Sequence, residues 1–332
     1  MLLIDCEKCT ACSICEGSCA FAAISVAADC AEVNESCTLC GACVDNCPEG
    51  ALRIEVAQKR QQEDVQSYSG ILVIAECRHG QIAPVSFELL GIGRKLADKR
   101  DVTLSVLLLG DKVEEYSKAL IAAGADTVLL GTSPALAQFR EDVFAKILTR
   151  VIRERKPEVV LAGATAIGRS VVPFVATQVN AGLTADCTQL DIRESDGMLL
   201  QTRPAFGGNI MATIECPDTR PQMATVRPNV MPTPEPDPKR SGETLLLDLK
   251  ESDLNSAVEV LETVQSEEDN VNIQEVEVLV SGGRGLASEK GFVLVRALAN
   301  ELNAAVAASR AAVDAGWIPY PHQVGRASTR VS

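Results

Sequence analysis

The sequence predicts an α/β protein in three parts: a small cysteine-rich α+β unit, a doubly wound α/β domain, and an incomplete nucleotide-binding α/β unit. Ten of the 13 cysteines lie within the first 47 of the 332 residues. From residue 70 onward, short apolar runs alternate with amphipathic stretches, which is typical of a parallel sheet covered by helices. After residue 275 the pattern of a strand, a glycine-rich turn and a helix begins again.

The charge balance favours a protein or a small molecule as the partner. Lys and Arg number 31 against 45 Asp and Glu, which gives a formal net charge of −14. This surplus repels nucleic-acid phosphates and anionic membrane surfaces, so we expect neither as a partner. No apolar run approaches the ~18 residues of a membrane span, and the first residues, MLLIDCEKC, lack the pattern of a signal peptide. We therefore expect a cytoplasmic protein without a membrane span.

The cysteines form a repeated ligand pattern. The spacing C-x2-C-x2-C-x3-C occurs twice, 28 residues apart, at Cys9, Cys12, Cys15 and Cys19 and at Cys37, Cys40, Cys43 and Cys47. Three thiolates at this spacing wrap one 4Fe-4S cluster, and in two-cluster proteins the fourth cysteine ligates the other cluster. We predict two 4Fe-4S clusters, the first ligated by Cys9, Cys12, Cys15 and Cys47, the second by Cys37, Cys40, Cys43 and Cys19. Cys6 lies outside both runs.

Short apolar segments flank each cysteine run, which suits two pseudo-symmetric strand–helix–strand halves. Residues 1–56 resemble the bacterial two-cluster ferredoxin, with Ala20 where that family usually has proline. Two zinc sites are the alternative, but tetrahedral zinc pairs do not account for the repeated spacing. The other cysteines lack spaced partners and are expected to be buried, inert thiols: Cys30, Cys77, Cys187 and Cys216.

The doubly wound domain is predicted to span residues 70–250, after a polar linker at residues 57–69. Its buried strands are expected at residues 70–76, 102–110, 126–131 and 158–163. The segments between them, such as residues 84–100 and 141–156, have the apolar spacing of helices. Ligands or partners are expected beyond the carboxyl ends of the strands.

From Thr184 the pattern changes to hairpins. We expect them within residues 199–218 and 222–231, with a turn at residues 207–209. Four prolines between residues 232 and 238 predict a stiff linker or strap. An acidic linker is predicted at residues 251–274, where a solvated face is favoured over a docking surface for a basic partner.

The last part, residues 275–332, opens with Gly282, Gly283, Arg284 and Gly285 between a predicted strand and a predicted helix. Free backbone amides, a helix N-terminus and Arg284 together suit a phosphate, although a tight turn without a ligand is the alternative. Ser309 and Arg310 end the next apolar segment and are expected at the same sheet edge. Neither His79 nor His322 has a partner at nucleophile or metal spacing, so no catalytic residue is predicted.

Residues 70–325 resemble the alpha subunit of electron transfer flavoproteins. The resemblance rests on long ordered stretches, including GATAIGRSVVPFVATQVNAGLTADCTQLD and AASRAAVDAGWIPYPHQVG. It implies a first α/β domain that pairs with a beta subunit and a smaller second domain that holds FAD. The N-terminal extension is similar to the form found in anaerobic, electron-bifurcating complexes.

The resemblance also implies which residues contact FAD. These are Arg284, Ser309, Arg310, Val324 and Gly325, beside the turn glycines Gly283 and Gly285. Arg310 is expected to stabilise a negatively charged flavin. Ala307 stands where the family usually has glycine. Arg326 and Ala327 do not match the family's flavin contacts, so we expect a C-terminally truncated FAD domain that holds the cofactor weakly.

These observations predict an electron-transfer subunit. It passes electrons between FAD, its iron-sulfur clusters and a partner, with flavin-based electron bifurcation as one form of that activity. The expected partners are an electron transfer flavoprotein beta subunit, an acyl-CoA or 2-hydroxy acid dehydrogenase, and ferredoxin. The alternatives are a fragment that acts only as an iron-sulfur and pairing module without FAD, and an electron carrier whose clusters store charge.

Overall fold

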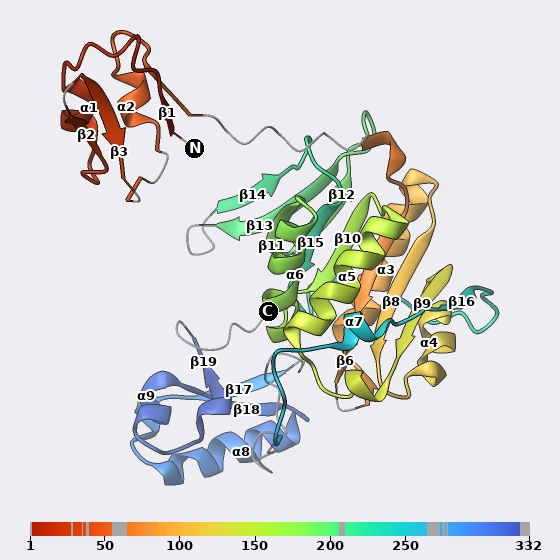
Figure 1. Ribbon diagram of the computed structural model, residues 1–332. Coiled ribbons are helices and arrows are strands. Elements are labelled where there is room, and N and C mark those ends of the chain that lie inside the picture. The colour runs from red at the N-terminus through yellow and green to blue at the C-terminus, as the bar shows by residue number, and fades with distance from the viewer. Residues whose placement is uncertain are drawn as a thin grey trace. The chain divides into compact units, whose positions relative to one another are not determined.

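The computed structural model describes residues 2–27, 29–34, 36–37, 40–54, 65–78, 80–205, 210–263, 273, 276 and 278–325. The chain divides into two compact units, Met1–Asp64 and Val65–Ser332. Both combine helices and strands, and the larger unit contains the seven-stranded sheet of the predicted α/β fold (Figure 1). Within the described ranges, no helix has the length and apolar character needed to cross a membrane.

The smaller unit consists of two strand–helix–strand halves, as predicted. Its elements are β1 (Leu2–Ile4), α1 (Ile14–Ser18), β2 (Ile24–Ala27), β3 (Cys30–Val33), α2 (Ala42–Asp45) and β4 (Leu52–Ile54). The strand β1 pairs antiparallel with β4, and β2 pairs antiparallel with β3. Ser13 and Gly41 precede the two helices at equivalent positions of the repeat, and both have the left-handed backbone conformation, with φ of 59° and 84°. The same sharp turn therefore starts each helix.

The larger unit is built on a seven-stranded sheet with the order β11-β15-β10-β5-β8-β9-β16. Its strands are β5 (Ile71–Ala75), β8 (Leu104–Gly110), β9 (Thr127–Thr132), β10 (Val159–Gly163), β11 (Gly182–Cys187), β15 (Gln222–Val226) and β16 (Glu243–Leu246). All neighbouring pairs are parallel. The central strands are buried on both faces, which explains their continuous apolar runs.

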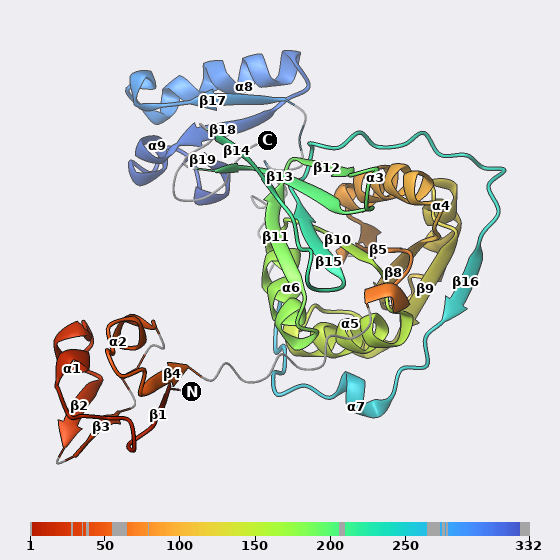
Figure 2. The same ribbon diagram turned by 90° about the horizontal axis from the view of Figure 1, so that it is seen from above.

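Helices cover both faces of this sheet, and the doubly wound prediction is confirmed (Figure 2). One face packs against α3 (Pro84–Arg100) and α4 (Ser117–Ala122), and the other against α5 (Glu141–Arg155) and α6 (Ala166–Gln178). Connecting pieces are the hairpin β6 (Cys77–Arg78) and β7 (Gln81–Ile82) and the 3-10 turns η1 (Val65–Ser67), η2 (Glu114–Tyr116) and η3 (Pro134–Leu136).

The expected hairpins after Thr184 are only partly correct. The strands β12 (Gln189–Ile192), β13 (Leu199–Ala205) and β14 (Ile210–Ile214) do form an antiparallel sheet. In contrast, β15 lies between β10 and β11 as a parallel strand of the main sheet, because all five of its residues are buried. The predicted turn at residues 207–209 lies outside the described residues.

Residues 232–242 form a proline-rich strap that leads to a strand not predicted from the sequence. A Cβ at Gly91 would lie 2.9 Å from the Pro232 carbonyl oxygen, so the strap packs closely against α3. It ends in β16, which pairs with β9 at the edge of the sheet. The predicted acidic linker then begins with α7 (Glu251–Leu254), followed by Asn255, whose carbonyl oxygen accepts a 2.6 Å hydrogen bond from Lys146 Nζ on α5.

The C-terminal part holds a three-stranded parallel sheet. Its elements are β17 (Leu279–Gly282), η6 (Arg284–Leu286), η7 (Glu289–Gly291), α8 (Phe292–Glu301), β18 (Ala305–Ser309), α9 (Arg310–Asp314), η8 (Tyr320–His322) and β19 (Gln323–Val324). The glycine-rich turn leads into two 3-10 turns, and the helix starts only at Phe292, so the expected helix N-terminus at this turn is wrong. Tight packing explains the delay, since a Cβ at Gly291 would lie 2.7 Å from the Leu286 carbonyl oxygen.

Asp126 fastens the strap to the main sheet. Its Oδ1 accepts a 2.7 Å hydrogen bond from Arg240 of the strap, and its Oδ2 accepts from Arg94 of α3 (2.7 Å) and from the Leu104 backbone N–H (2.8 Å). Partial burial opposes ionisation of the carboxyl, but these donors outweigh it and lower the pKa of Asp126.

We expect Asp126→Asn to lower the free energy of unfolding by about 2 kcal/mol, since it replaces charge-assisted hydrogen bonds and places an amide donor against two guanidinium groups. Because the folded-state pKa is depressed, this stabilisation is present above the ordinary pKa of about 3.9 and is lost as the pH falls through the folded-state pKa. Denaturant unfolding at pH 7 and at acid pH measures both effects. Asp98→Asn is the control, because Asp98 pairs with the same Arg94 but its side chain is 66% exposed. Equal losses in both variants would contradict the assignment.

Candidate functional site

Two cavities of the smaller unit are lined by the predicted cysteine ligands. The first cavity is lined by Cys9, Cys12, Cys15 and Cys47. Cys15 lies on α1 and is buried, Cys12 is exposed in the preceding loop, and Cys47 comes from the other half of the repeat, two residues after α2. This ligand set therefore joins both halves of the unit.

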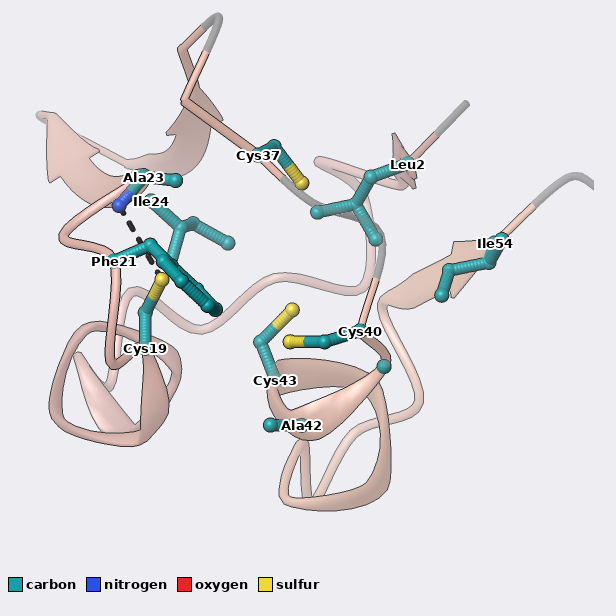
Figure 3. A pocket seen from close by; sticks show the side chains of 11 residues that line it. Leu2, Cys19, Phe21, Ala23, Ile24, Cys37, Cys40, Ala42, Cys43 and Ile54 are labelled. Atoms are coloured by element: carbon teal, nitrogen blue, oxygen red, sulfur yellow. Dashed lines mark hydrogen bonds between the residues drawn. The ribbon is translucent and has the colours of Figure 1, made fainter. Parts of the chain in front are cut away.

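The second cavity is lined by Cys37, Cys40, Cys43 and Cys19 (Figure 3). Cys43 lies on α2 and is buried, whereas Cys19 follows α1 in the first half. Figure 3 shows the four sulfur atoms turned toward a common space beneath Leu2 and Ile24. The structure thus brings together the two crossed groups of four cysteines that the spacing predicts.

The lining of both cavities fits an iron-sulfur cluster. Each offers four thiols in apolar surroundings, and thiolates are the usual ligands of 4Fe-4S clusters. Although four thiols line each cavity, no three His, Cys, Asp or Glu side chains among the described residues are placed to hold a single metal ion. Backbone N–H groups reach the fourth sulfur of each run, from Ala23 to Cys19 Sγ (3.3 Å) and from Ala51 to Cys47 Sγ (3.4 Å). A cluster bound there supplies one-electron chemistry.

The environment of individual thiols differs. Burial raises the pKa of the Cys15 and Cys43 thiols, which lie on the helices. The pKa of Cys19 is lowered by its backbone hydrogen bonds, that from Ala23 first. Ligation requires the thiolate form, so the backbone donors favour the ligating state of Cys19.

The expectation of four buried, inert thiols is correct only for Cys187. That thiol is fully buried, and burial raises its pKa to about 12. Cys30 is joined to Cys6 by a disulfide, with a Cα–Cα distance of 5.3 Å, so neither of the two is available as a ligand. Cys77 and Cys216 are half-buried. Sequence spacing does not reveal the Cys6–Cys30 pair, because Cys6 lies in the turn after β1 and Cys30 begins β3, 24 positions later.

Most of the predicted flavin contacts meet at the carboxyl edge of the C-terminal sheet. Gly282 of β17 pairs with Ala308, and Ser309 of β18 pairs with Val324 of β19, so the three parallel strands end together. A Cβ at Gly283 would lie 3.4 Å from Ser309 Oγ, and one at Gly285 would meet no atom within 4 Å. The space beside both glycines is therefore open at this edge.

The two arginines at this edge are accessible. Arg284 is exposed in η6, and Arg310 starts α9, where its Nε lies 3.2 Å from Asp314 Oδ2. The Arg310 side chain is 69% exposed, and such a surface ion pair is weak enough to yield to an anionic ligand. The edge thus fits FAD, a cofactor with a pyrophosphate group and a ring whose charge changes on reduction.

The other residues singled out from the sequence have structural positions or lie outside the described residues. His322 is buried, and its Nδ1 lies 2.8 Å from the Val306 carbonyl oxygen, which accounts for it without a catalytic role. Ala307 is fully buried inside β18. His79, Arg326 and Ala327 lie outside the described residues.

Family models match all three parts of the chain. The electron transfer flavoprotein domain matches residues 71–252, and the electron transfer flavoprotein FAD-binding domain matches residues 272–332. A 4Fe-4S binding domain matches residues 32–53, a range that contains the second cysteine run. An FAD-binding domain and a 4Fe-4S motif are therefore present.

Curated relatives agree with these matches. The chain is 46% identical to electron transfer flavoprotein subunit alpha of Thermoanaerobacterium thermosaccharolyticum over 80% of this chain and 81% of the relative. It is 38% identical to the lactate dehydrogenase (NAD(+),ferredoxin) subunit LctC of Acetobacterium woodii over 92% of this chain and 73% of the relative. It is 39% identical to the acryloyl-CoA reductase electron transfer subunit beta of Anaerotignum propionicum over 81% of this chain and 80% of the relative. The chain belongs to the electron transfer flavoprotein alpha-subunit family, and a 4Fe-4S domain precedes the family's flavoprotein domains.

Proposed function

We propose that this subunit passes single electrons between FAD at the edge formed by Gly283, Ser309 and Val324 and two 4Fe-4S clusters in the N-terminal unit. The observation that carries the proposal is the crossed arrangement of the thiols, with four around each cavity. Two ligand sets of this kind suit two clusters, because each set alone supplies the four thiolates that one cluster needs. The protein's part is to hold the cofactors and to set their potentials.

The proposed partners are an electron transfer flavoprotein beta subunit, a dehydrogenase and ferredoxin. The names of two relatives support this proposal, since one belongs to a lactate dehydrogenase that uses NAD(+) and ferredoxin and the other to an acryloyl-CoA reductase. We propose flavin-based electron bifurcation as the form of the activity, with an acyl-CoA or 2-hydroxy acid dehydrogenase as the source or acceptor of electrons.

The strand β14 is the surface we assign to the beta subunit. Among the described residues it pairs with β13 alone, so one of its edges has free backbone donors and acceptors. It also exposes large apolar side chains, with Ile210 at 53% and Met211 at 54% exposure. An edge strand with apolar side chains suits a permanent protein interface.

The two-cluster proposal predicts about eight irons per chain in anaerobically purified protein. Cys47→Ser should reduce the iron content by up to half, because it removes a ligand of the first cavity only. Cys6→Ser is the control and should leave the iron content unchanged, since Cys6 pairs with Cys30 and lines neither cavity. Iron and sulfide analysis measures both. Four irons in the unmodified chain, or a requirement for Cys6, would contradict the ligand assignment.

The flavin proposal predicts about one FAD per complex of this chain with a beta subunit. Arg310→Ala should weaken FAD binding about 10- to 100-fold, because one charge-assisted hydrogen bond is worth about 1.5–3 kcal/mol. The flavin-to-protein ratio after gel filtration gives the measurement, and Arg296→Ala on the exposed side of α8 serves as the control. A ratio near zero in the unmodified complex would instead favour an iron-sulfur and pairing module without FAD.

The interface proposal predicts that Ile210→Asp weakens the complex about 10- to 100-fold, since a buried apolar side chain contributes about 1.5–3 kcal/mol. Co-purification and titration with the beta subunit test this. Leu261→Asp is a matched control, because Leu261 is 89% exposed in the acidic segment. If both variants bound as the unmodified chain does, β14 would not be the interface.

A further inference from the structure

The 28-residue repeat allows the surroundings of the two cavities to be compared position by position. Equivalent residues line both: Ala51 and Leu52 in the first cavity correspond to Ala23 and Ile24 in the second. The backbone N–H groups of the two alanines donate to Cys47 Sγ and Cys19 Sγ at 3.4 and 3.3 Å. Hydrogen bonds to sulfur raise the potential of a cluster, but this pair of donors is present in both halves. They do not distinguish the two sites.

One pair of equivalent positions does distinguish them. The second residue after the last cysteine of each run is Phe21 in the first half and Glu49 in the second. Phe21 lines the second cavity (Figure 3). Glu49 lines the first. Of the charged side chains that the structure describes, Glu49 is the one that lines either cavity.

A second carboxylate lies near the first cavity and has no charged equivalent in the other half of the repeat. Glu16 of α1 accepts a 2.6 Å hydrogen bond from the backbone N–H of Val26, and Val26 lines the first cavity. The equivalent of Glu16 in the second half is Val44, which has no charge. Asp45, the next residue of α2, is exposed and lines neither cavity.

We infer that Glu49 and Phe21 set the order of the two cluster potentials, and that the cluster in the first cavity has the lower one. The inference rests on the proposed two-cluster function. A nearby negative charge disfavours the addition of an electron to a group that is already anionic, so the carboxylate lowers the potential of its own site.

Phe21 lowers the potential of the second site and so works against the difference that Glu49 makes. Its effect is the smaller of the two. An apolar cover also disfavours the more highly charged reduced cluster, because it removes water. Phe21 is itself 53% exposed, however, so it is only a partial cover of the second cavity. A cluster held in the second cavity would therefore be reduced first, and one held in the first cavity beside Glu49 would be the stronger reductant.

A redox titration of the full-length protein monitored by electron paramagnetic resonance tests this order. Cys47→Ser and Cys19→Ser each leave one ligand set intact and assign the two signals. Glu49→Gln should make reduction of the first-cavity cluster easier by about three- to tenfold, and tenfold is ~59 mV for one electron. Phe21→Glu should make the second-cavity cluster harder to reduce by a similar factor. The double exchange Phe21→Glu with Glu49→Phe should invert the order.

The control is Glu32→Gln, since Glu32 is an exposed carboxylate of β3 that lines neither cavity, and it should shift neither potential. Both expected shifts should shrink as the ionic strength rises, because exposed charges are screened by salt. Eight irons with potentials that Glu49→Gln does not move, or a first-cavity cluster that is reduced first, would overturn this inference alone. Four irons in the unmodified chain would overturn the two-cluster proposal and this inference with it.

Discussion

The N-terminal unit depends on the convergence of thiols from both halves of the repeat. Its helices have five and four residues, and helices this short are not stable in isolation. Its apolar core is small, with Leu2, Ile24 and Leu52 as its largest buried members. A unit of this size usually needs a staple such as a metal or a disulfide. Clusters bound as proposed would supply such a staple, because each set of four cysteines that lines a cavity combines a loop and helix of one half with a cysteine of the other.

The larger unit is held together mainly by apolar packing on the two faces of its sheet. Its parallel sheet is buried on both faces, and two apolar clusters, one on each side, provide the stability. Polar contacts then fix the periphery, and Asp126 shows how, because its carboxylate joins α3, β8 and the strap in one group. The antiparallel strands β12, β13 and β14 form a separate sheet, and its edge strand β14 is the proposed surface for the beta subunit.

The two kinds of redox site use the chain in opposite ways. Each proposed cluster site is a cavity lined by four thiols and apolar side chains. The proposed flavin edge is instead open and is formed by glycines, a hydroxyl and exposed arginines. Enclosure suits a small cluster that exchanges electrons at short range. An open edge suits a large cofactor that a second subunit helps to cover.

The sequence by itself predicted which four cysteines line each cavity and the parallel core, because spacing and apolar period are local properties of the chain. The residues of the proposed flavin edge are those that the family resemblance implies. The sequence did not determine which strands lie side by side, so β15 was expected in a hairpin and β16 was not expected. The same limit applies to Cys6 after β1 and Cys30 of β3, which pair across 24 positions of the chain, and to the late start of α8 at Phe292. The sequence shows Phe21 and Glu49 at equivalent positions of the repeat, but only the folded unit places each beside a different cavity. Tertiary structure decided these points because they depend on contacts between segments far apart in the chain, and no local pattern encodes such contacts.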